Sequence, residues 1–337
     1  MFQLIQDDGR VGYGCLDGPV VFNPEAFVLR GFFGRPLGRL RRRLALGGFT
    51  YLGLLGPDWL VAVAAVRLGY AANVFGFFCD LRTGRSWERS LKDLPSRLVF
   101  PLDPDAHAIH YAGRGCRLDL AKSHARGRLE VEAAFGGRLA LDARFPFGFE
   151  DQPLRVVNPS CGDPRRFTFT EKAAPLVPET FRAVFDGREL KGPAAAVVDW
   201  SAGYFNRHTN WYWGALAGFL EDGTPVGANF AALVNESYYP EDAFWIGGRR
   251  ERVAQVIFEV DPDRPEGGDW RVFTEDGRVD LRFRPLGGRG ERAWLPGMKV
   301  NFRQLAGLWR GRLRTRDGRE ARLEDVPGVA EVHLSVW

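Results

Sequence analysis

RLEVEAAFGGRLALDARF, residues 128–145, decides the fold class of this 337-residue chain. Apolar residues occupy every second position on both sides of a Gly-Gly pair, at 129, 131, 133 and 135 and again at 139, 141, 143 and 145. This alternation places one face of an extended strand in the core and the other in water. The two glycines between the runs are typical of a tight turn. The stretch therefore predicts a hairpin of half-buried antiparallel strands.

The same period recurs along the chain, in Leu118–Leu120 and in Val279–Arg284. Asp-Gly pairs at 222–223, 276–277 and 317–318 each separate two candidate strands, and such pairs readily adopt the positive φ of hairpin turns. Residues 51–78 are apolar, but charged residues and glycines interrupt them, which favours two or three buried strands over a membrane span. Only residues 179–185 show a local helical pattern. The chain is therefore predicted to be all-β with very little helix.

A strand-rich chain of this length must close or stack its sheets, because open antiparallel edges invite aggregation. We expect two antiparallel β-barrels or sandwiches packed together. The turn-rich residues 158–164 indicate a boundary, which divides the chain into an N-terminal domain, 1–165, and a C-terminal domain, 166–337. Strands are free to cross between the halves.

The charge distribution argues against nucleic acid as a partner. The chain has 46 basic and 42 acidic residues, and this excess is small and dispersed. Arg35, Arg39 and Arg41–Arg43 form a local exception, which we interpret as a solvated loop or strand edge. The alternative is contact with an anionic lipid at a membrane surface, a phosphate or a partner. The N-terminal residues include two acids and no signal-peptide pattern, so we expect a cytoplasmic protein without an integral membrane segment.

The segment DWSAGYFNRHTNWYW, residues 199–213, is the strongest candidate for a functional site. It combines aromatic rings with an acid, a guanidinium, an imidazole and two carboxamides, a mixture that is typical of a pocket wall. Trp211 and Trp213 should project from one side of a strand. Each residue also has a structural interpretation, since the rings can fill a barrel and Asp199 can pair with Arg207. The candidates in this segment are Asp199, Trp200, Tyr204, Arg207, His208, Trp211 and Trp213.

Further candidates lie on either side of this segment. Lys172 follows a strand-like run and is a candidate to hold a carboxylate or to form a Schiff base. Asn229, Glu236, Gln304 and Glu331 are polar residues beside apolar ones, which indicates either orientation of a ligand's polar group or capping of turns. We expect no metal, because His107 and His110 are three apart on a strand-like segment, and no cofactor, because no nucleotide-binding or hydrolase motif is present.

A set of short motifs occurs in a fixed order along the chain. Its residues are Phe169–Lys172, Asp199-Trp200, Gly203-Tyr204, Thr209, Trp211, Trp213, Gly227–Phe230, Asn235-Glu236, Val279–Pro285, Gln304, Gly307, Gly328, Glu331 and Trp337. This ordered set resembles a bacterial family described only as a domain of unknown function, which is distantly similar to the double lipocalins of the carotenoid hydratase type. The resemblance implies a pair of lipocalin-like β-barrels.

The resemblance also implies a chemistry. Hydratases of that type protonate an isolated double bond, and aromatic rings stabilise the resulting cation. In this chain Asp199 would be the acid, Trp211 and Trp213 the walls, and Glu236 or His208 would place water. The histidine–tryptophan pair of the hydratases is replaced in this chain by Trp211–Trp213.

Three functions follow as hypotheses. The first is binding of a hydrophobic small molecule, of isoprenoid or long-chain acyl type, in an aromatic-lined cavity. The second is an acid-initiated hydratase, isomerase or cyclase that acts on such a ligand. The third is a structural or interaction protein whose barrels are filled.

Overall fold

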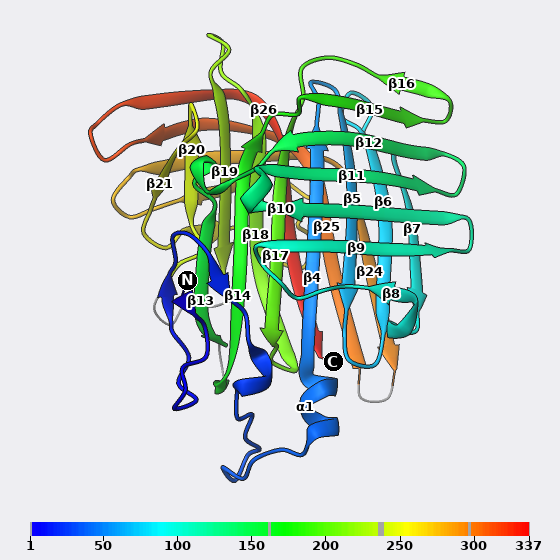
Figure 1. Ribbon diagram of the computed structural model, residues 1–337. Helices are drawn as coiled ribbons and strands as arrows, with labels where there is room; N and C mark the ends of the chain where they lie inside the picture. Colours follow the sequence, from blue (N-terminus) through cyan, green and yellow to red (C-terminus); the bar gives the residue numbers. More distant parts are fainter. Residues whose placement is uncertain (1, 161–162, 235–238, 296–297, 337) are drawn as a thin grey trace.

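The computed structural model describes residues 2–160, 163–234, 239–295 and 298–336 (Figure 1). It confirms the all-β class, because these residues form three antiparallel sheets of seven, eight and nine strands. A short parallel pair, β1 (Phe2–Gln3) and β3 (Val20–Val21), lies apart from them. The described helices are α1 (Arg39–Ala45) and four single turns, η1 (Pro24–Ala26), η2 (Pro95–Arg97), η3 (His124–Arg126) and η4 (Phe149–Asp151). None of them is long and apolar enough to cross a bilayer.

The nine-stranded sheet comes from the C-terminal part of the chain, whereas the strands of the other two sheets interleave along the part before it. In spatial order, the eight-stranded sheet consists of β2 (Gly14–Cys15), β13 (Leu154–Ser160), β14 (Asp163–Leu176), β17 (Ala195–Tyr204), β4 (Leu46–Leu55), β5 (Trp59–Arg67), β6 (Ala72–Asp80) and β7 (Ser86–Asp93). The seven-stranded sheet consists of β16 (Arg188–Leu190), β15 (Thr180–Phe185), β12 (Leu139–Pro146), β11 (Arg128–Phe135), β10 (Cys116–Ser123), β9 (Ala106–Gly113) and β8 (Leu98–Val99). The nine-stranded sheet consists of β21 (Arg249–Arg252), β20 (Ala243–Ile246), β19 (Pro225–Ala232), β18 (His208–Phe219), β26 (Glu320–Val336), β25 (Met298–Arg314), β24 (Val279–Leu295), β23 (Trp270–Phe273) and β22 (Ile257–Glu259).

The eight-stranded sheet is the middle layer of the molecule. One of its faces, which includes Leu52 and Val61, packs in one core with Leu118 of the seven-stranded sheet. The opposite face, which includes Tyr51, packs in a second core with Trp213 of the nine-stranded sheet. In Figure 1 the strands of the seven-stranded sheet cross those of the middle sheet. Successive residues of a middle strand therefore project into different layers.

The nine-stranded sheet curls around a core of its own. This third core contains Trp270, Phe283 and Trp309, all fully buried, so the sheet forms a filled half-barrel. At Gly227 of this sheet an added Cβ would lie 2.4 Å from the carbonyl carbon of Ala174 in β14. The absence of a side chain there allows the backbones of the two sheets to approach closely.

Most of the sequence-based strand predictions are confirmed. β10, β11 and β12 form the expected meander, with Leu129 paired to Phe145. The three Asp-Gly pairs lie in the turns that join β18 to β19, β23 to β24 and β25 to β26. Residues 51–78 form most of β4, β5 and β6.

Two local predictions are wrong. Residues 179–185 are not helical, because Thr180–Phe185 pair with β12 and extend the seven-stranded sheet. The arginine run was predicted as a loop or strand edge, but Arg39–Ala45 form the helix α1 and only Arg35 lies in the loop before it. Arginine, leucine and alanine all have high helix propensity, and this accounts for the short helix.

Strands from both sides of residue 165 share the middle sheet. Residue 165 itself lies in β14, and β17 pairs with β4, which comes from the N-terminal part of the chain. This pairing brings residues far apart in sequence into one layer.

Candidate functional site

A row of three polar side chains runs across the middle sheet. Lys172 of β14 is paired in register with Asp199 of β17, and Asp199 is paired with Tyr51 of β4. Directly paired residues project from the same face of an antiparallel sheet. All three side chains therefore face the nine-stranded sheet.

A second row lies across the nine-stranded sheet. Arg289 of β24 is paired with Gln304 of β25, Gln304 with Glu331 of β26, and Glu331 with Trp213 of β18. Four neighbouring strands thus contribute one side chain each to the same face.

The two rows face each other between the sheets. The rings of Tyr51 and Trp213 meet edge to face, with centroids 5.4 Å apart. The guanidinium of Arg289 lies 3.7 Å from the ring centroid of Phe75, which belongs to the middle sheet. We call the seven residues of the two rows, Lys172, Asp199, Tyr51, Arg289, Gln304, Glu331 and Trp213, the interlayer site.

Glu331 is the carboxyl group of the interlayer site whose pKa is raised. Its Oε1 accepts a hydrogen bond of 2.7 Å from Trp211 Nε1, and its Oε2 accepts one of 3.0 Å from Gln304 Nε2. Burial raises the pKa of Glu331 to about 7, although the two N–H donors and Arg289 favour the ionised form. The nearby Asp199 charge adds to the increase. This carboxyl group can therefore exchange a proton near neutral pH.

Lys172 and Asp199 form a fixed ion pair. Lys172 Nζ lies 2.5 Å from Asp199 Oδ2 and 3.4 Å from Glu241 Oε2. Burial by itself would lower the pKa of Lys172, but Asp199 and Glu241 outweigh it and raise that pKa. The lysine thus remains protonated, which makes it an anchor for the two carboxylates and a poor Schiff-base nucleophile.

Aromatic side chains flank the acid. Trp211 stacks on His333 of β26, with ring centroids 3.7 Å apart and nearly parallel planes. Trp213 Nε1 donates a hydrogen bond of 2.8 Å to Asn229 Oδ1. Asn229 in turn donates to the backbone oxygen of Glu241, at 2.7 Å, so its amide orients Trp213.

Three polar atoms of the interlayer site have no hydrogen-bond partner in the described part of the chain. They are the hydroxyl of Tyr51, Oε1 of Gln304 and Nε of Arg289, and all three are buried. A buried polar atom without a partner is costly and commonly marks a position that a ligand or water satisfies. The interlayer site therefore offers three unpartnered polar atoms beside a carboxyl group and aromatic rings.

The unpartnered hydroxyl leads to a prediction for Tyr51→Phe. Removing it should leave the free energy of unfolding unchanged or raise it by up to about 1 kcal/mol, because no bond is lost and a buried polar atom is removed. Urea denaturation of the two proteins measures the difference. A loss of more than about 1 kcal/mol would mean that the hydroxyl has a partner within the folded chain.

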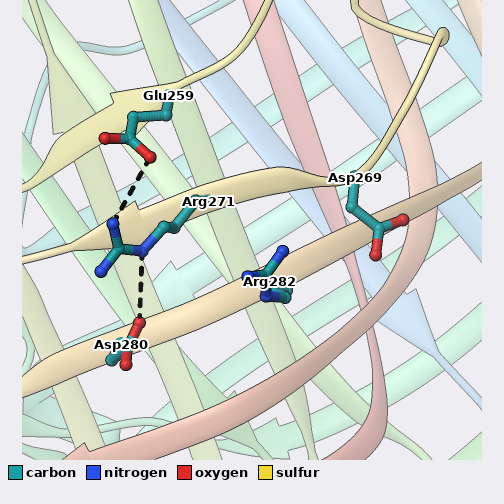
Figure 2. Close-up of a pocket in the computed structure, with 5 residues that line it drawn as sticks. All are labelled: Glu259, Asp269, Arg271, Asp280 and Arg282. Carbon is teal, nitrogen blue, oxygen red and sulfur yellow. Dashed lines mark ion pairs between the residues drawn. The ribbon is translucent and has the colours of Figure 1, made fainter.

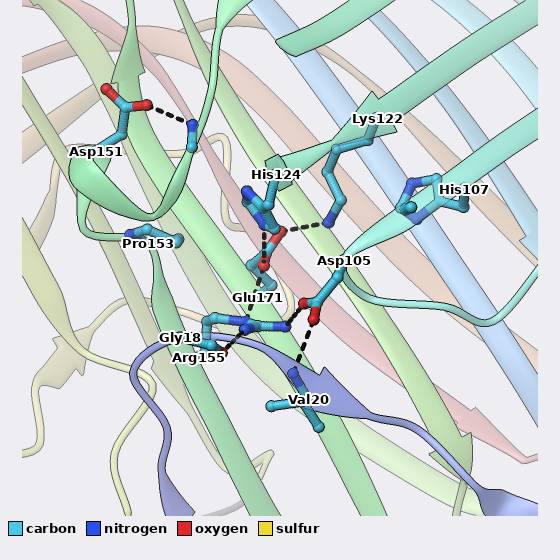
Figure 3. A network of polar contacts seen from close by, with 12 residues as sticks. Gly18, Val20, Asp105, His107, Lys122, His124, Asp151, Pro153, Arg155 and Glu171 are labelled. Carbon is cyan, nitrogen blue, oxygen red and sulfur yellow. Dashed lines mark hydrogen bonds and ion pairs between the residues drawn. The ribbon is translucent and has the colours of Figure 1, made fainter. Parts of the chain in front are cut away.

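A second group of charged side chains lies on the opposite face of the middle sheet (Figure 3). Glu171 Oε1 accepts from Lys122 Nζ at 2.5 Å, and Oε2 lies 2.8 Å from His124 Nε2 and 3.0 Å from Arg155 Nε. Arg155 also pairs with Asp105. We call these five residues the buried ion cluster.

Residual exposure distinguishes the central charges of the two groups. In the interlayer site, the side chains of Lys172, Asp199 and Glu331 keep 6, 10 and 8% of their accessible surface. In the buried ion cluster, Lys122 and Glu171 keep 1 and 0%, and Asp105 at its edge keeps 20%. The centre of the cluster is sealed and its opposite charges are in direct contact, so we assign the buried ion cluster to the architecture.

The structure separates the remaining predicted residues from the interlayer site. Trp200 and Tyr204 project from the other face of β17 into the first core, where Trp200 lies beside Lys122. Arg207 and His208 are exposed at the turn between β17 and β18. Glu236 lies outside the described residues.

A surface pocket of about 480 Å³ differs in its lining from the interlayer site (Figure 2). Five charged residues line it: Glu259, Asp269, Arg271, Asp280 and Arg282. Arg271 pairs with both Glu259 and Asp280, at 3.5 Å each. A pocket with this lining offers little apolar surface, so we assign no ligand to it.

Sequence reasoning did not identify Tyr51, Arg289, His333 or Glu241 as site residues. Tyr51 lies in an apolar strand and Arg289 in a glycine-rich stretch, so neither stands out locally. Only the pairing of β17 with β4 and of β24 with β25 brings these two residues into the site.

Comparison with known proteins places the chain in a family. Residues 27–337 match the family described as a domain of unknown function, DUF2804. The chain belongs to this family. A comparison with curated protein sequences gave no match.

Three solved structures are similar to this DUF2804 protein and have little sequence in common with it. A candidate AttH from Nitrosomonas europaea has a TM-score of 0.50 at 12% identity, covering 85% of this chain and 92% of that chain. Kievitone hydratase from Nectria haematococca has a TM-score of 0.49 at 11% identity, covering 86% and 89%. CghA has a TM-score of 0.48 at 13% identity, covering 99% and 97%. At 12% identity the likeness to the first of these structures concerns the fold alone.

Proposed function

We propose that this protein is an enzyme that binds a hydrophobic small molecule at the interlayer site and transfers a proton to it. The reaction class is hydration, isomerisation or cyclisation. The observation that supports this most strongly is Glu331, a carboxyl group whose pKa is raised to about 7 beside two indole rings.

Glu331 is better suited than Asp199 to deliver the proton. A general acid needs a pKa near the working pH. Asp199 is engaged in an ion pair with Lys172, whose Nζ lies 2.5 Å from its Oδ2. Glu331 instead accepts from two neutral N–H donors, and the His333 ring 3.9 Å away is neutral because burial lowers the pKa of His333 to about 3. We therefore assign the acid role to Glu331 and a fixed negative charge to Asp199.

The surrounding rings match the charge that proton delivery creates. Protonation of a carbon–carbon double bond produces a cation, and the faces of Trp211, Trp213 and Tyr51 can stabilise it. The negative charge of Asp199 adds long-range stabilisation in a site of low dielectric. Gln304, Tyr51 and Arg289 each offer an unpartnered polar atom that can hold water or a polar group of the ligand.

The first test is to identify the ligand and then to measure its conversion. Native mass spectrometry of freshly purified protein, followed by organic extraction, should find an apolar compound that is lost from the Trp211→Ala, Trp213→Ala double variant. With that compound as substrate, Glu331→Gln should lower kcat by about 100-fold or more while the ligand still binds.

Glu324→Gln is the matched control, because Glu324 is an exposed glutamate on the same strand, β26. This variant should turn over like the wild type. Unchanged turnover in Glu331→Gln would remove the assignment of the acid. A ligand that binds tightly but is never converted would favour a carrier over an enzyme.

A further inference from the structure

The segment before β4 forms a projecting apolar and basic surface at one end of the molecule. In Figure 1, α1 and the loop before it extend beyond the ends of the strands. Phe32 and Phe33 lie at the tip of this loop and are 83 and 88% exposed. Leu40 of α1 is 70% exposed. Such exposure of large apolar side chains in a cluster needs an explanation.

The tip of the loop, residues 31–35, is a hydrogen-bonded turn. Gly34 N donates to Gly31 O at 2.9 Å, and Gly31 N donates to Arg35 O at 2.9 Å. Gly34 has a φ of +77°, which glycine adopts without strain. Arg165 donates to Gly31 O at 2.8 Å and ties the turn to β14. The fold therefore holds the two phenylalanines outward.

Positive charge surrounds the exposed rings. No acidic residue occurs between Glu25 and Asp58, whereas this stretch contains six arginines in and before α1. They are Arg30, Arg35, Arg39, Arg41, Arg42 and Arg43. Within the described part of the chain, none of the six forms a salt bridge. Arg42 instead donates to the backbone oxygen of Phe27, at 3.2 Å, and anchors the helix.

Another exposed aromatic residue, Trp294, lies at the same end of the strands. β4 begins directly after α1, and its first residue pairs with Tyr204, at the end of β17. The next strand, β18, begins at His208, which pairs with Val336, and Val336 also pairs with Lys299. Lys299 is paired with Trp294, which is 71% exposed. The end of β24 therefore adds an aromatic side chain to this face.

We propose that this end of the protein docks on an anionic lipid bilayer. The arginines would bind the headgroups, and Phe32, Phe33 and Trp294 would enter the interfacial region. Basic residues attract the protein to anionic membranes, and exposed aromatic residues insert at the boundary between headgroups and acyl chains. Uncompensated positive charge around the rings favours lipid over a second copy of this chain, whose same face would repel it.

Vesicle co-sedimentation of the full chain tests the proposal. The wild type should bind vesicles that contain phosphatidylglycerol, bind pure phosphatidylcholine weakly, and dissociate as salt increases. Phe32→Ala, Phe33→Ala should reduce the partition coefficient about tenfold or more. Arg39→Gln, Arg41→Gln, Arg43→Gln should reduce it about 100-fold, because each lost charge removes about one factor of five.

The matched control removes three exposed arginines elsewhere, with Arg188→Gln, Arg249→Gln and Arg322→Gln, and should bind like the wild type. Absence of wild-type binding, or equal binding of all variants, would overturn the proposal. A second result would also overturn it: the wild type does not bind vesicles but forms a concentration-dependent dimer in gel filtration, and the Phe32→Ala, Phe33→Ala variant does not form this dimer. Circular dichroism verifies that each variant is folded.

The docking proposal stands independently of the proposed enzymatic function. Together, membrane docking and the proposed enzymatic function would allow an apolar ligand to pass from the bilayer to the interlayer site. The pair of Trp211 with His333, beside that site, lies only three residue pairs along β18 from the pair of His208 with Val336 at the docking end. Absence of vesicle binding by the wild type, together with normal turnover of a soluble substrate, would overturn the docking proposal alone.

Discussion

Replacing Glu171 with glutamine should lower the free energy of unfolding by about 4 kcal/mol. Glu171 is the one carboxylate in direct contact with both Lys122 and Arg155 in the described residues. Glutamine keeps the size of the side chain but leaves a fully buried ammonium group uncompensated. Such loss of one partner is far more costly than loss of a whole ion pair. Urea denaturation near neutral pH measures the effect.

A rescue variant separates charge from packing. Adding Lys122→Met to Glu171→Gln removes the stranded charge and leaves Arg155 with Asp105, so most of the lost stability should return. No recovery in the double variant, or a loss below about 1 kcal/mol in the single variant, would contradict the assignment of this cluster to the architecture.

The same cluster should make the protein sensitive to acid. Burial alone would raise the pKa of Glu171, but Lys122, His124 and Arg155 outweigh it and hold the pKa well below its usual range. A depressed pKa contributes stability above the ordinary pKa of glutamate, and that stability is lost as the pH falls. The Glu171→Gln variant should lack this part of the acid dependence.

The second large effect concerns Glu331→Gln and has the opposite sign. The pKa of Glu331 is about 7 in the folded state, compared with an ordinary value of 4.5. Between these values the folded state holds a proton that the unfolded state releases, so the wild type loses stability as the pH rises through this window. The shift corresponds to about 3 kcal/mol. Glutamine cannot ionise, so the variant should lack this loss.

Urea denaturation at about pH 5 and about pH 8 checks this prediction. The stability of Glu331→Gln relative to the wild type should increase by about 2.5 kcal/mol between the two pH values, because part of the change lies below pH 5. Rotation of the Gln304 amide lets its free oxygen accept from the new amide, so the hydrogen bond between positions 304 and 331 can persist. Equal pH dependence in both proteins would contradict a raised pKa at Glu331.

The sequence was sufficient for the strands because their period is local. Alternation in 128–145 and the Asp-Gly pairs predict hairpins from neighbouring residues, and β10–β12 form as expected. Residues 180–185 were predicted wrongly because their strand pairs with β12, which is distant in sequence. Local pattern cannot contain that information.

The candidate site was predicted in part for the same reason. Asp199, Trp211 and Trp213 stand out in one segment, and the structure brings them together with Lys172, Gln304 and Glu331. Trp200 alternates with Asp199, so it faces the other layer. Tyr51 and Arg289 enter the site only through sheet register, which no local pattern specifies.

Glu171 did carry a signal that alternation could reveal. Phe167, Phe169 and Glu171 share one phase of β14, and Leu118, Leu120 and Lys122 share one phase of β10. A charge at the apolar phase of a strand indicates a buried partner of opposite charge. Glu171 and Lys122 are two such charges, of opposite sign, in strands of facing sheets. Together they are the sequence signature of the buried ion cluster.

The proposed acid can be tested most directly by a titration of Glu331 itself. Carbon-13 NMR of protein labelled at the glutamate carboxyl carbons follows each group with pH, and the Glu331→Gln variant identifies the signal. We expect one carboxyl to titrate near pH 7 in the wild type, to be absent from the variant, and to shift when the extracted ligand binds. If every glutamate in the wild type titrates near or below its ordinary value of 4.5, Glu331 is not the acid that the proposed function requires.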